Sequence, residues 1–356
     1  MVDTIRLFTK ISLKDLRMEK WKKFIDKETG VIESYYDYIG KVRIAFYPDT
    51  KSLSLSGRYI SSETKDRTKN FDDLFSTQQE LKDFFIKFEK KVNNYFKSPK
   101  VNILKDKITR IDYTFNLETK YVNKYIEFFN LYFEREKDIK FKNYSNHVTE
   151  SSLDFEGSFY MKTEKQYNEN KNQNFTINFY NKQNQLQSTA INELATKFNT
   201  NITDEDILSA ENILRLEIQL HHQKLKTVCL RNNIDWQTRS LSDLFDINIA
   251  QEAISHEIKR FFTDADFYSY QKAKEIIISK ISNRRSRKSA LEYIEAVSKN
   301  NKVKSYTIER KLIEIGVFPY YFLPKQWNID ILENPIKLID KKITDNNLQN
   351  LTLKEI

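Results

Sequence analysis

The sequence predicts an α+β protein in which helices cover antiparallel sheet. Apolar and polar side chains alternate over several short segments, as they do in strands with one buried face. Other segments carry apolar residues at helical spacing, and these dominate after about residue 230. Gly and Pro number only five each, which argues against a Gly-rich phosphate loop. Neither the P-loop nor the dinucleotide-binding glycine motif is present.

Composition narrows the class of protein further. A chain of 356 residues can bury a sizeable core, and an aromatic content of 13% argues against disorder. The single Cys229 excludes a disulfide framework and a multi-Cys zinc site. Lys and Arg outnumber Asp and Glu by 59 to 50, a net charge of +9. A positive net charge suits a protein that binds nucleic acid, although a soluble basic protein without such a partner would have the same charge.

The first part of the chain alternates strands with helices. Residues 3–8 predict a strand, and residues 41–48 and 52–59 predict a hairpin. Residues 76–96 predict an amphipathic helix, with Ser76 and Gln79 as its capping box. The residues expected on its buried stripe are Leu81, Phe84, Phe85, Phe88 and Val92.

The next part repeats this order of elements. Residues 107–116 predict a strand, followed by a helix near 119–134. Residues 157–163 and 174–182 predict a second hairpin. A short helix over 189–198 and a strand over 212–222 complete this part. Strands arranged around a helix therefore occur twice, which suggests a diverged internal duplication.

The pattern divides the chain into two domains, residues 1–230 and residues 231–356. The first contains the strands, and the second contains mainly helical periodicity. The aromatic segment 316–327 is expected in the core or as a lid on the helical region. The tail after Trp327 is rich in Asn, Lys and Asp and is expected to fray.

Three of these strands carry unusual polar faces. If the three strands are neighbours in one sheet, the faces merge into a single polar surface. That surface would contain two arginines, two carboxylates, a tyrosine and a lysine, namely Arg110, Asp112, Tyr180, Lys182, Arg215 and Glu217.

Such a set suits chemistry on a phosphodiester. Two carboxylates can hold a hard divalent cation, and guanidinium groups can stabilise charge on a phosphate. A tyrosine hydroxyl can attack phosphorus, but its ordinary pKa of about 10 is too high for unaided ionisation. A cation such as Lys182 or the metal is expected to lower that pKa.

Two alternatives stay open at this point. The charged residues could form ordinary cross-strand ion pairs beside a nucleic-acid groove, in a replication or regulatory protein without nuclease activity. The protein could also be structural, with an incidental basic charge.

In these motifs the chain resembles the gene II replication initiators of filamentous phages. It is more distantly similar to the Rep initiators of rolling-circle plasmids. The matching segments, in order, are DTIRL at the start, TRIDYTFN at 109–116, INFYNK at 177–182 and LRLEIQLHHQKLK at 214–226. They cover roughly residues 1–230.

The resemblance implies a rolling-circle replication initiator that nicks and joins one DNA strand at an origin. Tyr180 would be the nucleophile and Lys182 its helper. Asp112 and Glu217 would bind Mg²⁺ or Mn²⁺, while Arg110 and Arg215 would contact phosphate or orient the carboxylates. The implied partners are single-stranded or supercoiled origin DNA and a host helicase and polymerase.

Some features depart from the wider class of nicking initiators. That class uses a His–hydrophobic–His metal motif, which none of the four His form. His221 and His222 are expected on opposite faces of a strand, so that they cannot share one ion. Tyr160 and Tyr167 are alternative nucleophiles, whereas Tyr113 should face the apolar side.

The densest basic cluster follows the predicted domain boundary. At the start of a helix such a cluster can grip DNA phosphates, although a solvated helix start has the same composition. Ser286 or Ser289 is expected to cap that helix. The residues are Lys280, Arg284, Arg285, Arg287 and Lys288. The early charges of MVDTIRLFTK and the lack of a long apolar run predict a cytoplasmic protein without a membrane partner.

Overall fold

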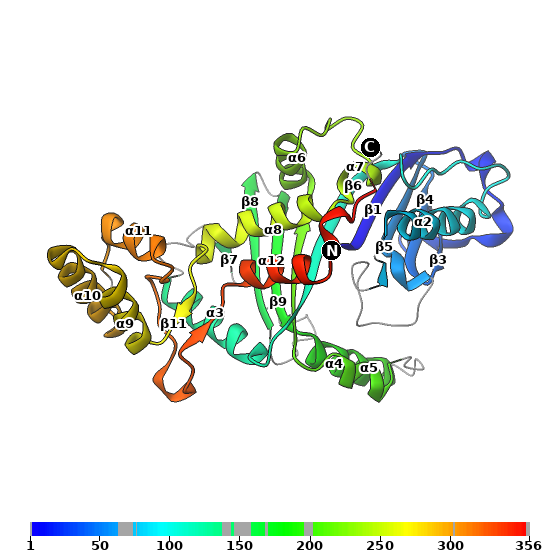
Figure 1. The fold of residues 1–356 in the computed structure, drawn as a ribbon. Coiled ribbons are helices and arrows are strands. Elements are labelled where there is room, and N and C mark those ends of the chain that lie inside the picture. Colours follow the sequence, from blue (N-terminus) through cyan, green and yellow to red (C-terminus); the bar gives the residue numbers. More distant parts are fainter. Residues whose placement is uncertain are drawn as a thin grey trace.

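The computed structural model describes residues 2–62, 74–75, 77–136, 144–145, 158–167, 170–195, 202–301 and 303–353. One antiparallel sheet of ten strands runs through the molecule (Figure 1), in the order β2-β3-β4-β5-β1-β6-β10-β9-β8-β7. Its strands are β1 (Val2–Lys10), β2 (Lys22–Ile25), β3 (Ile32–Ile39), β4 (Lys41–Tyr47), β5 (Ser52–Arg58), β6 (Lys107–Glu118), β7 (Tyr144–Ser145), β8 (Ser158–Tyr167), β9 (Asn170–Asn181) and β10 (Ile213–Leu220).

Helices surround this sheet, and a small two-stranded sheet lies among the C-terminal ones. The small sheet pairs β11 (Phe267–Tyr268) with β12 (Ile331–Leu332). The helices are α2 (Gln78–Asn93), α3 (Val122–Glu136), α4 (Lys182–Ala195), α5 (Asp204–Ser209), α6 (His222–Arg231), α7 (Leu241–Leu244), α8 (Ile247–Phe262), α9 (Tyr270–Lys280), α10 (Arg284–Ser298), α11 (Tyr306–Glu314) and α12 (Pro335–Asp345). The predicted fold class, antiparallel sheet covered by helices with a helical C-terminal part, is confirmed.

The sheet consists of two halves with the same internal order. From the centre outward the first half runs β1, β5, β4, β3, β2, and the second runs β6, β10, β9, β8, β7. Each strand of the first half therefore has a counterpart five places later in the chain. The two halves meet where β1 pairs antiparallel with β6. This is the arrangement expected of the internal duplication that the order of elements suggested.

One face of the sheet is apolar and carries the helices. The predicted stripe on α2 is fully confirmed, because all five of its residues are buried. On the second half, the Phe129 ring of α3 lies 4.5 Å from the Phe179 ring of β9 and 4.5 Å from the Phe262 ring of α8, between centroids. Tyr113 faces this side as predicted, and its hydroxyl donates to the Leu244 carbonyl at 2.8 Å. Figure 1 shows α2, α8 and α12 lying over the sheet.

Two sequence expectations about helix ends are wrong. The capping box of α2 is formed by Thr77 and Glu80, one residue later than predicted; Ser76 lies outside the described residues. The tail after Trp327 does not fray, because it contains α12. Asn334 caps this helix through the Ile336 N–H, and Pro335 occupies its first turn. Its buried residues Ile336, Ile339 and Ile343 belong to the main core.

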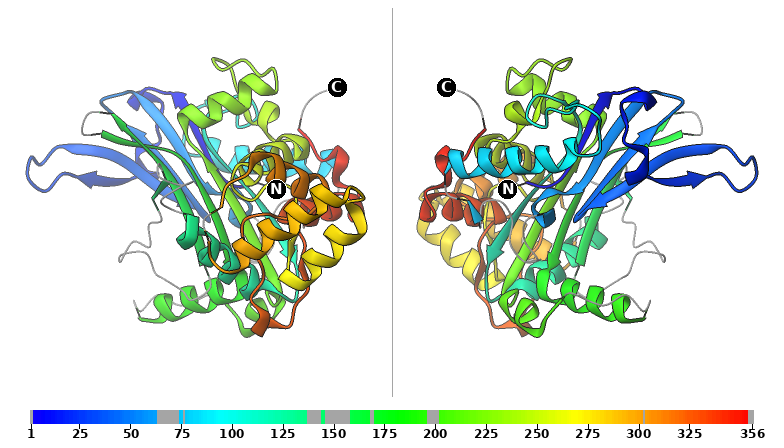
Figure 2. Two further views of the ribbon diagram at one scale, coloured as in Figure 1. Left: turned by 90° about the vertical axis from the view of Figure 1, so that its left-hand side faces the viewer. Right: turned by 90° about the vertical axis from the view of Figure 1, so that its right-hand side faces the viewer.

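The main hydrophobic core includes side chains from Val2 to Leu353 and so extends across both predicted domains. A second cluster joins α9, α10 and α11. The aromatic segment 316–327 contributes Phe318 and Leu323 to the main core and Val317 and Phe322 to the second cluster. The division at residue 230 stays a prediction. Figure 2 shows the first half of the sheet extending away from the C-terminal helices.

Candidate functional site

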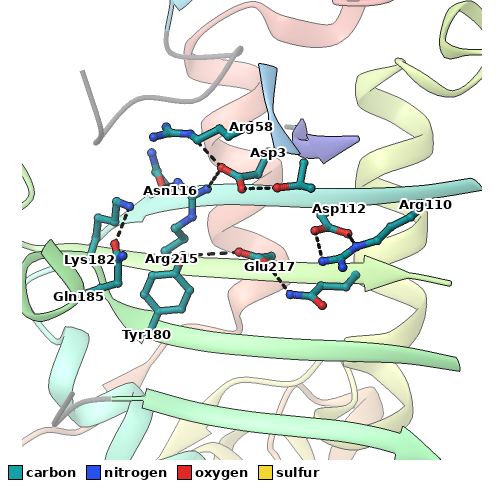
Figure 3. A network of polar contacts seen from close by, with 12 residues as sticks. Asp3, Arg58, Arg110, Asp112, Asn116, Tyr180, Lys182, Gln185, Arg215 and Glu217 are labelled. Atoms are coloured by element: carbon teal, nitrogen blue, oxygen red, sulfur yellow. Dashed lines mark hydrogen bonds and ion pairs between the residues drawn. The ribbon is translucent and has the colours of Figure 1, made fainter. Parts of the chain in front are cut away.

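The three predicted strands are neighbours, as β6-β10-β9, in the middle of the second half. Opposite residues of an antiparallel pair point to the same face. Arg215 lies opposite Asn116 on β6 and Tyr180 on β9. Gln219 lies opposite Asp112. The predicted strand residues Arg110, Asp112, Tyr180, Arg215 and Glu217 therefore share one polar face (Figure 3). Tyr113, next to Asp112 on β6, points to the other face.

Tyr180 points to Glu217 on this face. Its hydroxyl lies 3.5 Å from Glu217 Oε2, and the Gln219 side-chain amide donates to Glu217 Oε1 at 2.8 Å. Burial raises the pKa of Tyr180 above its ordinary value, and although Arg215 lowers it, Glu217 raises it further. The net shift among the described residues is upward, so the lowering of the Tyr180 pKa expected from Lys182 is not found, and a lowering by a bound metal stays a prediction. A nucleophilic Tyr180 needs a base, and Glu217 is the carboxylate in position to be one.

Lys182 was predicted to lie on the strand, but in the structure it is the first residue of α4. The strand ends at Asn181, whose side-chain oxygen accepts the Asn184 N–H at 3.2 Å and so starts the helix. Lys182 is buried, and its ammonium donates to Gln185 Oε1 at 2.8 Å. Burial lowers the pKa of Lys182 well below its ordinary value, and the charges of Arg215 and Arg58 lower it further.

Asp3 links the first half of the sheet to this site, and sequence reasoning missed it. Its Oδ1 accepts from Arg215 Nη2 at 2.5 Å and lies 3.1 Å from Arg58 Nε. Arg215 also donates to Asn116 Oδ1 at 3.3 Å. Burial opposes ionisation of Asp3, but Arg215 and Arg58 outweigh it and lower the pKa of Asp3. The signal available in the sequence was the polar position of Asp3 in the matching segment DTIRL.

Arg110 and Asp112 form a bidentate ion pair along one strand. Arg110 Nε and Nη2 donate to the two carboxylate oxygens at 2.7 and 2.6 Å. Asp112 is 1% exposed. Burial raises its pKa to about 7, and although Arg110 opposes the shift, the negative charges of Glu217 and Asp3 add to it. Arg110 therefore orients Asp112, one of the two roles predicted for it.

A hard divalent cation fits best at Glu217. Thr114 and Asn178 lie opposite Glu217 on its two neighbouring strands. Among the described residues, the buried Oγ1 of Thr114 and Oδ1 of Asn178 have no hydrogen-bond partner. These neutral oxygens and the carboxylate are ligands that Mg²⁺ and Mn²⁺ prefer. Asp112 fits less well, because Arg110 occupies both of its oxygens. No group of three or more His, Cys, Asp or Glu suited to a metal occurs in the described part of the chain.

The histidines at the end of β10 take helical positions. The strand ends at Leu220, so His221 is the N-cap residue of α6 and His222 its first residue. The expectation that they lie on opposite faces of a strand is therefore wrong. The His222 ring packs edge-on against Trp236, with centroids 4.8 Å apart. Tyr160 and Tyr167, the alternative nucleophiles, lie on β8, but their side chains are outside the described set.

The basic cluster lies on the helical end of the molecule, remote from the first half of the sheet (Figure 1). Lys280 ends α9, and Arg284, Arg285, Arg287 and Lys288 form the first turns of α10. Arg284, Arg285 and Lys288 are exposed. The cap is Asn283, whose oxygen accepts the Ser286 N–H at 2.9 Å, and neither predicted serine. None of the described helices combines the length and apolar character that crossing a bilayer requires.

Comparison with family models, curated proteins and solved structures gave no match. The resemblance to replication initiators stays a prediction.

Proposed function

We propose that the protein initiates rolling-circle replication by nicking and joining one DNA strand at an origin. The observation that carries this proposal is the contact between the Tyr180 hydroxyl and Glu217, beside Arg215, on one polar face. The order of the four sequence motifs supports the same reaction. The substrate is single-stranded or supercoiled origin DNA in the cytoplasm of a bacterial host, where a helicase and polymerase extend the product.

In the proposed reaction, Glu217 takes the proton of the Tyr180 hydroxyl, and the tyrosine oxygen attacks the phosphorus. The bond to the 3′-oxygen breaks, this oxygen receives the proton, and the 5′-phosphate stays on Tyr180. Joining is the reverse, with a 3′-hydroxyl as the attacking group. Burial raises the pKa of Glu217, first by desolvation and then through the charge of Asp3. A carboxylate with a raised pKa is a better base near neutral pH.

The arginines stabilise the charge that develops on the phosphate. Asp3 holds Arg215 beside Tyr180, and a guanidinium has further N–H groups that can donate to phosphate oxygens. Arg110 keeps Asp112 in place on the same face. Thr114, Asn178 and the Oε1 of Glu217 would hold Mg²⁺ or Mn²⁺, while the Oε2 of Glu217 faces the Tyr180 hydroxyl. A bound cation would neutralise charge on the phosphate. Lys182, whose pKa is lowered, is positioned near Arg215 as a second proton acceptor.

The basic cluster of α9 and α10 supports DNA binding away from the polar face. Its exposed arginines lie at the start of α10, where the helix dipole makes positive side chains unfavourable unless an anion is near. We assign Lys280, Arg284, Arg285, Arg287 and Lys288 to phosphate contacts that are independent of base sequence.

The test is covalent capture. The protein is incubated with single-stranded circular DNA of its replicon and Mn²⁺, then denatured, and the DNA-linked protein is separated by size. Wild type should give an adduct and Tyr180→Phe none. Tyr47→Phe is the matched control, because Tyr47 occupies the corresponding position on β4 and follows the same Ile-x-Phe pattern.

A specific observation favours the alternative function, a non-enzymatic nucleic-acid-binding protein. Arg110 and Arg215 are both paired with carboxylates, as in a purely structural network. Wild-type protein that binds replicon DNA but forms no adduct with either strand supports this alternative. An adduct that persists in Tyr180→Phe instead assigns the nucleophile to another tyrosine, and peptide mapping would test Tyr160 and Tyr167.

A further inference from the structure

The duplicated sheet provides a second face equivalent to the site, with a different chemistry. The pairing register aligns Tyr180 with Tyr47, and Arg215, its partner on β10, with Ser52 on β5. Similarly, Glu217 corresponds to Ser54. On the central strands, Arg6 stands where the second half has Asp112. The first half has thus kept the geometry of the site, while the carboxylates of β6 and β10 are replaced by Arg and Ser.

We call the outward side of β1–β5, opposite α2, the basic face. Among these described strands its one carboxylate is Asp3, at the edge next to the site, where Arg58 and Arg215 pair with it. Glu33 and Asp37 point to the α2 side, and Asp37 accepts the Tyr95 hydroxyl there at 2.8 Å. The cations of the basic face are Arg6, Lys10, Lys22, Lys41, Arg43 and Arg58.

Aromatic rings lie between these cations. The Arg43 guanidinium lies 5.3 Å from the centroid of the Tyr36 ring, and Tyr36 meets Tyr38 edge-on at 6.1 Å. Tyr38 is 52% exposed. Among the described residues, neither Arg6 nor Arg43 has an ion-pair partner. The aromatic residues of the basic face are Phe8, Phe24, Tyr36, Tyr38 and Tyr47.

The basic face is continuous with the site. One row of opposite residues runs Arg43–Ser56–Arg6–Arg110 across four neighbouring strands. Arg58, on the same side of β5, contacts Asp3, which holds Arg215. From β4 to the strand of Tyr180 there are five strand spacings, about 24 Å.

We propose that the basic face is a platform that binds unpaired DNA and leads the strand to Tyr180. The cations contact the backbone phosphates, and Tyr36 and Tyr38 stack on bases. A flat row of Ser side chains on β5 lets the strand lie close to the sheet. The excess of cations over the single, paired carboxylate Asp3 favours a polyanion. The exposed rings favour a single strand, because duplex bases are already stacked. The direction of the strand toward Tyr180 rests on the proposed function, whereas binding to the platform does not.

The test uses the full chain and a labelled oligo(dT) of about 20 nucleotides, a length that covers such a platform. The affinity is measured by fluorescence anisotropy at several salt concentrations. Arg6→Ala/Arg43→Ala removes two phosphate contacts. The slope of the logarithm of the association constant against the logarithm of the salt concentration should therefore become shallower by about 1.4, and binding at 0.1 M salt should weaken about 25-fold. Tyr38→Ala should weaken binding about five-fold or more. The matched control is Lys87→Ala/Lys90→Ala, which removes the same charge from exposed positions of α2 on the opposite face.

The outcomes separate this inference from the proposed function. Equal affinity of Arg6→Ala/Arg43→Ala and the control overturns the platform, even when wild type still forms the adduct. Tighter binding of duplex than of single strand, or of RNA than of DNA, also overturns it. Selective loss of oligo(dT) binding supports the platform, even when no adduct forms. Tyr38→Ala changes an exposed side chain and so tests the platform if the double variant folds poorly.

Discussion

The buried Asp112 should make the stability of this protein fall as pH rises through the weakly acidic range. Its pKa is raised in the folded protein from 3.8 to about 7, chiefly by burial. Below about pH 4 the carboxyl is protonated in both the folded and the unfolded chain. Between pH 4 and 7 only the folded protein holds the proton, so its advantage declines as pH rises and is lost above the folded pKa.

The magnitude follows from the size of the shift. A difference of about three pKa units, at 1.36 kcal/mol each, is about 4 kcal/mol of unfolding free energy lost between pH 4 and 7. Glu217 contributes in the same direction, because its pKa is also raised by burial. Asp3 acts in the opposite sense, but at lower pH, because its pKa is lowered.

Urea unfolding of wild type and Asp112→Asn across this pH range measures the effect. The variant should be less stable overall, since it leaves Arg110 without its carboxylate, so the slopes with pH are compared instead of the levels. In Asp112→Asn, the unfolding free energy should lose most of the dependence on pH that wild type shows between pH 4 and 7. Asp49→Asn makes the same chemical change at the exposed tip of the β4–β5 hairpin and should keep the wild-type pH dependence. Equal slopes in wild type and Asp112→Asn would refute the assignment of a raised pKa to this buried carboxyl.

Three further predictions concern the site, the sheet and the basic cluster. Arg215→Ala should lower the unfolding free energy by about 3–5 kcal/mol, because it empties the site of the fully buried Arg215 and leaves the partly buried Asp3 without its closest partner. A loss below about 1 kcal/mol in urea unfolding would contradict this network. Gly57→Ala should lower the free energy of unfolding by at least about 1–3 kcal/mol, because Gly57 has φ +143° and an added Cβ would clash with the Lys41 carbonyl oxygen. A thermal unfolding midpoint equal to that of wild type would exclude this strain. Arg284→Ala/Arg285→Ala/Arg287→Ala should reduce the salt dependence of duplex DNA binding by about 2–3 in log–log slope, and an unchanged slope would show that this cluster does not contact phosphates.

The sequence alone determined most of the segments that form the sheet, although it missed β2, β3 and β7, and it determined which side chains of the predicted strands share a face. Alternation with a period of two is a local property of a strand, and it correctly gave β1, β4, β5, β6, β9 and β10. The faces of Arg110, Asp112, Tyr180, Arg215 and Glu217 followed from the same alternation. Helical spacing likewise gave the buried stripe of α2. Where local signals were weak, at the helix start of Lys182 and in α12, the sequence expectation failed.

Only the tertiary structure decided how these segments combine. Asp3 joins the site because β1 lies beside β6, and no local pattern encodes that neighbour. Burial of the polar face raises the pKa of Tyr180 above its ordinary value, whereas its neighbours in the sequence suggested that it would be lowered. The basic face likewise becomes visible only when the two halves of the sheet are aligned by register. Ion-pair partners and desolvation depend on which distant strands meet, and this information belongs to the whole fold.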